Sequence, residues 1–225
     1  MDKGLIKQII RSNRRTLALQ IAPDASLIVR APEKVSEKTI FTFVQKKLKW
    51  ILRHQKLARE SYRPSVKRKF VDGERFLYLG DWHKLFVIQD VTQPLVFDEK
   101  KFLLSESFLP DAKKLFEQWY RKQAYAAIKD RVRLYAKTAG LSFKRITITG
   151  ARKRWGSCGP KGTLNFSWRL IMAPMKVVDY VIVHELAHLE ERNHSRKFWE
   201  KVRLLFPDCQ QAENWLKANF WLLNF

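Results

Sequence analysis

A helix with two histidines four residues apart constrains this chain more than any other feature of its sequence. The segment reads His184-Glu185-Leu186-Ala187-His188, and a third histidine follows at His194. Positions i and i+4 lie on one face of a helix, so His184 and His188 can present two imidazole nitrogens to one metal ion. The apolar residues of this helix surround it almost completely and predict that it is buried: Val178, Tyr180, Val181, Ile182, Val183, Leu186, Ala187 and Leu189. Buried histidines are costly to desolvate without partners, which favours a metal site over histidines that only hydrogen-bond in the core.

His194 is the candidate third ligand. Catalytic zinc sites use three protein ligands and leave the fourth position to water. We expect the helix to span 175–192 and to end at Asn193, which tolerates the left-handed conformation and would turn His194 inward. A carboxylate from a later helix, Glu200 or Glu213, is the alternative, since sites with two histidines and one glutamate also bind zinc.

Glu185 is the candidate general base. It lies about 100° round the helix from His184, so it should miss the metal and face the water on it. Zinc would lower the pKa of that water, Glu185 would accept its proton during attack on a carbonyl, and the proton would pass to the leaving amine. The sequence therefore predicts a zinc hydrolase, most readily a peptidase.

A second unusual stretch, Arg152-Lys153-Arg154-Trp155-Gly156-Ser157-Cys158, combines cations, a large aromatic ring and a glycine. Arg154 is a candidate for neutralising the oxyanion formed when water attacks, and an ordinary bond to a carboxylate or carbonyl is the alternative. Cys158 is either a metal-reactive thiol or, as is commoner for a lone cysteine, a small buried apolar residue.

With both stretches in view, the chain resembles the YgjP-like zinc metallopeptidase family, which is related to the SprT-like and WLM groups. The resemblance rests on Arg154–Cys158, Leu164–Leu170, His184–His188, Asn193–Ser195 with Phe198-Trp199, and, nearer the N-terminus, Arg30–Pro32, Val71–Glu74 and Tyr78–Gly80.

This resemblance implies zinc held by His184, His188 and His194, with Glu185 as the catalytic base. Trp168 lies in one of the matched segments and is, with Arg154, a candidate substrate or transition-state contact. Ser167 departs from the asparagine expected in relatives, which leaves the metal centre untouched but could alter substrate contacts.

The resemblance leaves the substrate open. The family also carries an assignment as a nucleoside-triphosphate pyrophosphohydrolase acting on UTP, for which Arg152, Lys153 and Arg154 would hold phosphates on the same metal site. No glycine-rich phosphate loop supports that alternative. A nucleic-acid-associated binding module with structural zinc is the third possibility, but a closed structural site needs four protein ligands and has no need of Glu185.

The net charge of +22 is unusual for a metabolic enzyme. Ten of its cations crowd one segment: Lys46, Lys47, Lys49, Arg53, Lys56, Arg59, Arg63, Lys67, Arg68 and Lys69. Such a surface would attract nucleic acid or nucleotides without sequence preference, and a solvated basic face that binds nothing in particular is the equal alternative.

Other partners and the compartment follow from simpler signals. We expect no secretory signal and no membrane span, because no apolar run approaches the required length. Two cysteines cannot form a disulfide framework, so a reduced cytoplasmic setting is expected. The oligomeric state is not encoded in any feature of the sequence.

The pattern of elements predicts an α+β protein. An N-terminal lobe, residues 1–105, would combine a small antiparallel sheet with a basic helix, and a zincin-like metal-binding catalytic domain would occupy 106–225. We expect a hairpin over 16–30, a helix starting near Ser36, and a long helix that ends at Gly140. The strand 163–170 is either the free edge that receives an extended peptide or an ordinary internal strand.

Overall fold

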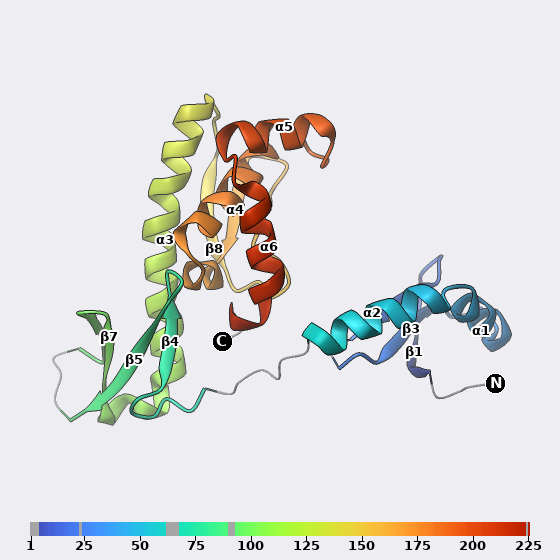
Figure 1. Ribbon diagram of the computed structural model, residues 1–225, viewed down its shortest axis with the longest axis horizontal. Coiled ribbons are helices and arrows are strands. Elements are labelled where there is room, and N and C mark those ends of the chain that lie inside the picture. The colour runs from blue at the N-terminus through green and yellow to red at the C-terminus, as the bar shows by residue number, and fades with distance from the viewer. Residues whose placement is uncertain (1–4, 23, 62–67, 90–92, 224) are drawn as a thin grey trace. The chain divides into compact units, whose positions relative to one another are not determined.

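The computed structural model describes residues 5–22, 24–61, 68–89, 93–223 and 225. It consists of two compact units, Met1–Pro64 and Ser65–Phe225, and both mix helices with small sheets, as expected for the α+β class (Figure 1). Within the described residues, no helix combines the length and the apolar character needed to cross a membrane.

The first unit is a three-stranded sheet with two helices on one face. Its elements are β1 (Ile6–Ser12), β2 (Ala18–Ile21), β3 (Leu27–Pro32), α1 (Glu37–Lys46) and α2 (Leu48–Ser61). Alternate residues of β3 pack on the helices in one apolar cluster: Leu27, Val29, Ala31, Ile40, Val44 and Ile51. The antiparallel β2–β3 pair confirms the predicted hairpin, and Ser36 caps α1 by accepting a hydrogen bond from the Thr39 amide at 3.2 Å. The sheet is mixed, not antiparallel as expected, because β1 pairs in parallel with β3 and not with its neighbour in sequence, β2.

The basic segment belongs largely to these helices. Lys46, Lys47, Lys49 and Arg53 are all exposed on or between α1 and α2. Arg63 and Lys67 lie outside the described residues, and so does the side chain of Arg59.

The second unit begins with a four-stranded sheet, in the order β4-β5-β7-β6. Its strands are β4 (Arg75–Tyr78), β5 (Asp81–Ile88), β6 (Leu95–Asp98) and β7 (Lys101–Ser105), followed by a 3₁₀ turn (Glu106–Asp111) and the long helix α3 (Ala112–Ala139). Phe76 of β4 stacks on Phe116 of α3 with ring centroids 4.2 Å apart, and Tyr120 of α3 donates to the Leu77 carbonyl at 2.8 Å. Because this sheet shares its core with α3, the compact unit starts at Ser65 and not near residue 106, where the sequence suggested a boundary. Gly140 ends α3 with φ of 65°, as predicted.

A second sheet of three short strands follows α3. It comprises β8 (Arg145–Thr149), β9 (Gly156–Cys158) and β10 (Thr163–Ser167) in the order β8-β10-β9. β10 pairs in parallel with β8 and antiparallel with β9, so both of its edges are occupied. The possible free edge at 163–170 is therefore wrong: β10 is the internal strand, because the turn after Cys158 folds β9 back onto its second side, and β8 and β9 are the edge strands.

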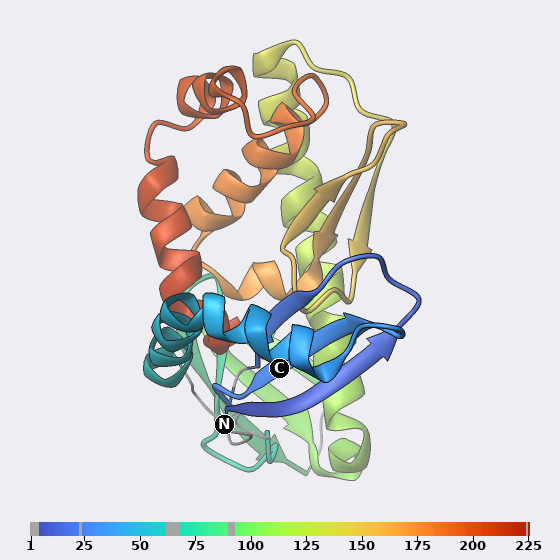
Figure 2. The same ribbon diagram turned by 90° about the vertical axis from the view of Figure 1, so that its right-hand side faces the viewer.

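The remaining elements surround the helix that carries the histidines. They are a 3₁₀ turn (Trp168–Met172), α4 (Met175–Ala187), α5 (Arg196–Leu205), α6 (Cys209–Asn219) and a last 3₁₀ turn (Phe220–Leu223). α4, drawn in orange, lies between α3 and α6 in Figures 1 and 2, and it also contacts α5 and β9. This enclosure is the burial that its all-round apolar sequence predicts.

Candidate metal centre

Helix α4 is fixed to α3 near its N-terminal end by an ion pair. Arg131 of α3 donates from Nε to Asp179 at 2.6 Å, and its Nη2 bonds the second carboxylate oxygen. The side chain of Asp179 is almost completely buried. This hydrogen bond to Asp179 also raises the pKa of Arg131. The ion pair thus fixes the N-terminal half of α4, and the site lies at the C-terminal end of the helix.

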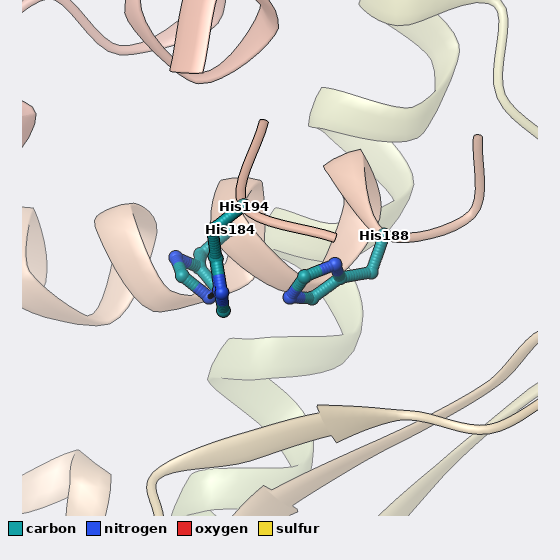
Figure 3. Close-up of side chains that lie close together, drawn as sticks. All are labelled: His184, His188 and His194. Atoms are coloured by element: carbon teal, nitrogen blue, oxygen red, sulfur yellow. Dashed lines mark hydrogen bonds between the residues drawn. The ribbon is translucent and has the colours of Figure 1, made fainter. Parts of the chain in front are cut away.

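Three histidines converge at the C-terminal end of α4. His184 lies in its last turn, His188 is its C-cap, and His194 comes from the loop before α5. One possible ligand atom from each lies within 4.8 Å of the others, and the Nε2 atoms of His184 and His194 are 3.0 Å apart (Figure 3). Two nitrogens bound to one tetrahedral zinc lie about 3.3 Å apart, so this spacing fits a shared ion.

The hydrogen bonds around the rings also suit metal binding. The Nδ1 atom of His188 lies 2.9 Å from the Glu191 carbonyl oxygen, so it donates there and leaves Nε2 as a free acceptor. Phe198 of α5 packs against the cluster, 4.6 Å from His188 and 4.8 Å from His194 between ring centroids. Burial, together with the neighbouring histidines, lowers the pKa of His184 to about 4. Neutral imidazole is the form that binds a metal.

The path of the chain to His194 differs from the expected one. α4 ends at Ala187, and a turn follows in which the Leu189 amide bonds to the Leu186 carbonyl at 3.0 Å and the Glu190 amide to the Ala187 carbonyl at 3.3 Å, three residues back and not four as in an α-helix. The expected helix over 175–192 with its end at Asn193 is therefore wrong. The chain leaves the helix at His188 because that ring turns its Nδ1 to the Glu191 carbonyl and so stabilises a non-helical turn. His194 then approaches from a loop, and Ser195 caps α5 through the Phe198 amide at 3.3 Å.

The side chain of Glu185 lies against β9. It packs so tightly against Gly156 that a Cβ atom at that position would lie 2.5 Å from its Cγ. The Cys158 amide donates to its carboxylate, whereas Oε2 is buried and has no hydrogen-bond partner among the described residues. The residue is only 6% exposed, and burial raises its pKa to about 7, although the nearby Arg154 opposes this rise.

Of the two candidate substrate contacts, only Arg154 is near the site. Arg154 is exposed, and its charge acts on Glu185. Trp168 is 0% exposed and stacks on Tyr120 with ring centroids 5.7 Å apart. The structure therefore does not support a substrate contact by Trp168, because the chain turns after β10 and directs this ring into the core.

The alternative ligands lie outside the histidine cluster. Glu200 pairs with Arg196 at 2.7 Å, and Glu213 pairs with Lys217 at 2.6 Å. Cys158 is not part of the cluster either, and burial raises the pKa of its thiol. Among the described residues, His184, His188 and His194 form the group of His, Cys, Asp and Glu side chains able to hold a metal ion.

Arg192 is a site residue that sequence reasoning missed. It donates to the carbonyls of Gly159 at 3.2 Å and Pro160 at 3.0 Å, and thereby ties the loop between His188 and His194 to the turn after β9. A surface arginine in a charged run carries no sequence signal of such a role, because its acceptors are distant backbone carbonyls.

Two solved structures resemble part of the chain. The metallopeptidase zymogen of Pyrococcus abyssi abylysin is 22% identical over 39% of this chain and 89% of its own, with a TM-score of 0.36. The metallopeptidase zymogen of Methanocaldococcus jannaschii jannalysin is 23% identical over 39% and 90%, with a TM-score of 0.35. No curated protein matches the sequence significantly.

The family match covers most of the chain. Residues 15–219 match the YgjP-like family, described as a metallopeptidase domain. Membership implies a hydrolase that acts on a protein or peptide and uses a divalent metal, and the three-histidine cluster agrees with that. The resemblance read from the sequence is thus confirmed, and the chain belongs to the YgjP-like family of metallopeptidases.

Proposed function

We propose that this protein is a zinc-dependent peptidase in which His184, His188 and His194 hold the ion and Glu185 is the general base. The observation that carries the proposal is the cluster of three imidazoles, whose possible ligand atoms lie within 4.8 Å of one another. One of them belongs to His184, the residue directly before Glu185. Three histidine ligands suit zinc and leave a coordination position open, which distinguishes a catalytic site from a closed structural one. When bound, the ion would supply Lewis-acid activation of a water molecule and of the substrate carbonyl.

The residues of the chain would provide the proton transfers. Glu185 would take a proton from the attacking water and deliver it to the leaving amine. Its buried Oε2 atom without a partner supports this role, because a carboxylate oxygen that is not engaged in the protein can accept a proton. Arg154, whose charge already acts on Glu185, would stabilise negative charge that develops on the substrate.

The second edge of β9 supports an extended peptide as substrate. β10 pairs with one edge of β9, no strand among the described residues pairs with the other, and Glu185 contacts β9 at Gly156 and Cys158. A peptide could add to this edge by backbone hydrogen bonds, which would bring its carbonyl groups next to the base.

The decisive experiment compares Glu185→Gln with Glu190→Gln in the metal-loaded full chain. Glu190 is exposed and pairs with Lys201, so it is a matched control five residues away, in the turn after α4. We expect Glu185→Gln to abolish cleavage of a denatured protein substrate while the metal content stays at that of the unmodified protein, and Glu190→Gln to remain active. A fully active Glu185→Gln protein would refute the role of the base.

Pyrophosphate release from UTP is measured on the same proteins. Arg152, Lys153 and Arg154 are all exposed just before β9 and could hold phosphates. UTP hydrolysis is therefore the second candidate activity. UTP hydrolysis that Glu185→Gln abolishes, without any peptide hydrolysis by the unmodified chain, would replace the peptidase assignment with that of a nucleotide hydrolase.

A further inference from the structure

Arg169 is a buried cation without a carboxylate partner among the described residues. It follows β10 in the 3₁₀ turn and is only 4% exposed. One guanidinium nitrogen donates to the Gly150 carbonyl at 3.0 Å, and the group lies 4.3 Å from the centroid of the Trp168 ring. Its Nε atom is buried, and no described residue forms a hydrogen bond with it. A buried charge in this state is costly unless an opposite charge arrives.

Two further arginines share this region. Arg121 of α3 approaches the same glycine, because a Cβ atom at Gly150 would lie 3.1 Å from its Nη2 atom. Arg152 lies two positions after Gly150, whose carbonyl accepts from Arg169. Burial lowers the pKa of Arg169, and the charges of Arg152 and Arg121 lower it further. Among the described residues, Glu117 is the acidic residue whose charge raises the pKa of Arg169. Its carboxylate already accepts two hydrogen bonds from Arg121, at 3.0 and 2.8 Å.

Of the three arginines, Arg121 adjoins open space. It lines a pocket of about 450 Å³ along α3, together with residues of the first turns of that helix. Lys113 and Lys114 line it and add positive charge, while Asp111 and Glu117 offset part of that charge.

We propose that Arg121, Arg152 and Arg169 bind an oxyanion group of the substrate, either a carboxylate or a phosphate. Guanidinium groups present several N–H donors in a fixed fork that fits both anions, and three of them around one engaged carboxylate leave a net positive site. A bound oxyanion would supply the charge and the acceptor that Arg169 lacks.

The position of the cluster connects it to the proposed catalytic residues. Ser167 holds both ends of the loop, because its hydroxyl donates to the Ala151 carbonyl at 2.7 Å and its amide to the Trp155 carbonyl at 2.8 Å. The next residue, Gly156, packs against Glu185. Gly156 is six positions after Gly150, so the two sites are at most about 20 Å apart along the chain. The substrate role of the oxyanion rests on the proposed function, whereas the binding of an anion does not.

The first test measures binding of inorganic phosphate to the metal-free full chain by calorimetry, at constant ionic strength with chloride as the control anion. Saturable binding is expected, and Arg152→Ala and Arg169→Met should each weaken it about tenfold. Arg133→Met is the matched control, since Arg133 is exposed on α3 away from Gly150. Arg152 is exposed, so Arg152→Ala keeps the test valid even if Arg169→Met fails to fold. Absence of saturable phosphate binding, or equal binding by Arg152→Ala and Arg133→Met, would overturn the proposal.

The second test identifies the source of the oxyanion in the metal-loaded protein. If the group is a peptide carboxylate, Arg152→Ala raises KM about tenfold for a peptide with a glutamate, leaves KM for the matched glutamine peptide unchanged, and preserves kcat for both. If the group is a nucleotide phosphate, the same variant raises KM for UTP. If Arg152→Ala leaves KM unchanged for the glutamate peptide, the glutamine peptide and UTP, the substrate role is overturned, even where phosphate binds. A protein that cleaves neither substrate type would refute the proposed function and leave the phosphate result standing.

Discussion

Gly156 of β9 lies directly against Glu185 of α4, so that any Cβ atom at position 156 would come within 2.5 Å of the glutamate side chain. The strand and the helix are distant in sequence, and this glycine is what allows them to approach. The contact fixes the position of the proposed base, which follows His184 directly in α4, against β9.

Gly156→Ala should therefore impair catalysis more than stability. The added methyl group must displace Glu185, and a shift of about 1 Å in a catalytic group can cost about 100-fold in kcat/KM. Metal content should stay unchanged, because the three histidines do not contact this glycine. Gly159→Ala is the control, since a Cβ there would meet its nearest neighbour at 3.4 Å, in ordinary contact. Equal activity of the two variants would contradict the positioning role of Gly156.

Removal of the metal should destabilise the second unit. Three histidines from α4 and the loop after it would no longer be joined by a shared metal ion. An ion at about 100 times its dissociation constant adds about 2.7 kcal/mol to the free energy of unfolding. We expect chelation to lower the Tm of the unmodified chain. His194→Ala should show a smaller metal-dependent Tm shift than the control His54→Ala, whose ring lies in the first unit on α2. A metal-dependent shift of the same size in both variants would exclude His194 as a ligand.

Arg131→Met should lower the free energy of unfolding by about 2–3 kcal/mol, because it leaves the carboxylate of Asp179 buried without its partner. The value lies below that for a fully buried pair, since the Arg131 side chain is 34% exposed. Chemical denaturation of Arg131→Met, Asp179→Asn and the double variant measures the coupling between them. Additive effects of the two single changes would show that the ion pair does not anchor α4.

The exposed cations of α2 should bind nucleic acid through counterion release. Changing Lys49 and Arg53 to Gln removes two charges and should reduce the slope of log K against log salt by about 1.8 for duplex DNA. Lys137 and Arg203, both exposed in the second unit, provide the control pair. Salt titrations monitored by fluorescence anisotropy give both slopes, and equal losses in the two variants would mean that binding follows net charge and not α2.

The local features of this protein could be read from the sequence. The helical period placed His184 and His188 on one face, Ser36 and Gly140 marked helix ends, and the pattern over 16–30 indicated the β2–β3 hairpin. Each depends on hydrogen bonds or side-chain spacing within a few residues, so the residues themselves specify it. The histidine cluster belongs to this class too, because His194 follows His184 by only ten positions and one turn can bring it back.

Tertiary structure alone decided the features that depend on residues far apart in the chain. β10 became a central strand because both β8 and β9 pair with it, and Trp168 became a core residue because the turn after β10 directs it onto Tyr120. The four-stranded sheet joined the second unit because its aromatic residues pack on α3. Strand pairing and core packing gain free energy from contacts whose partners no local pattern identifies, and the closeness of Gly156 to Glu185 has the same origin.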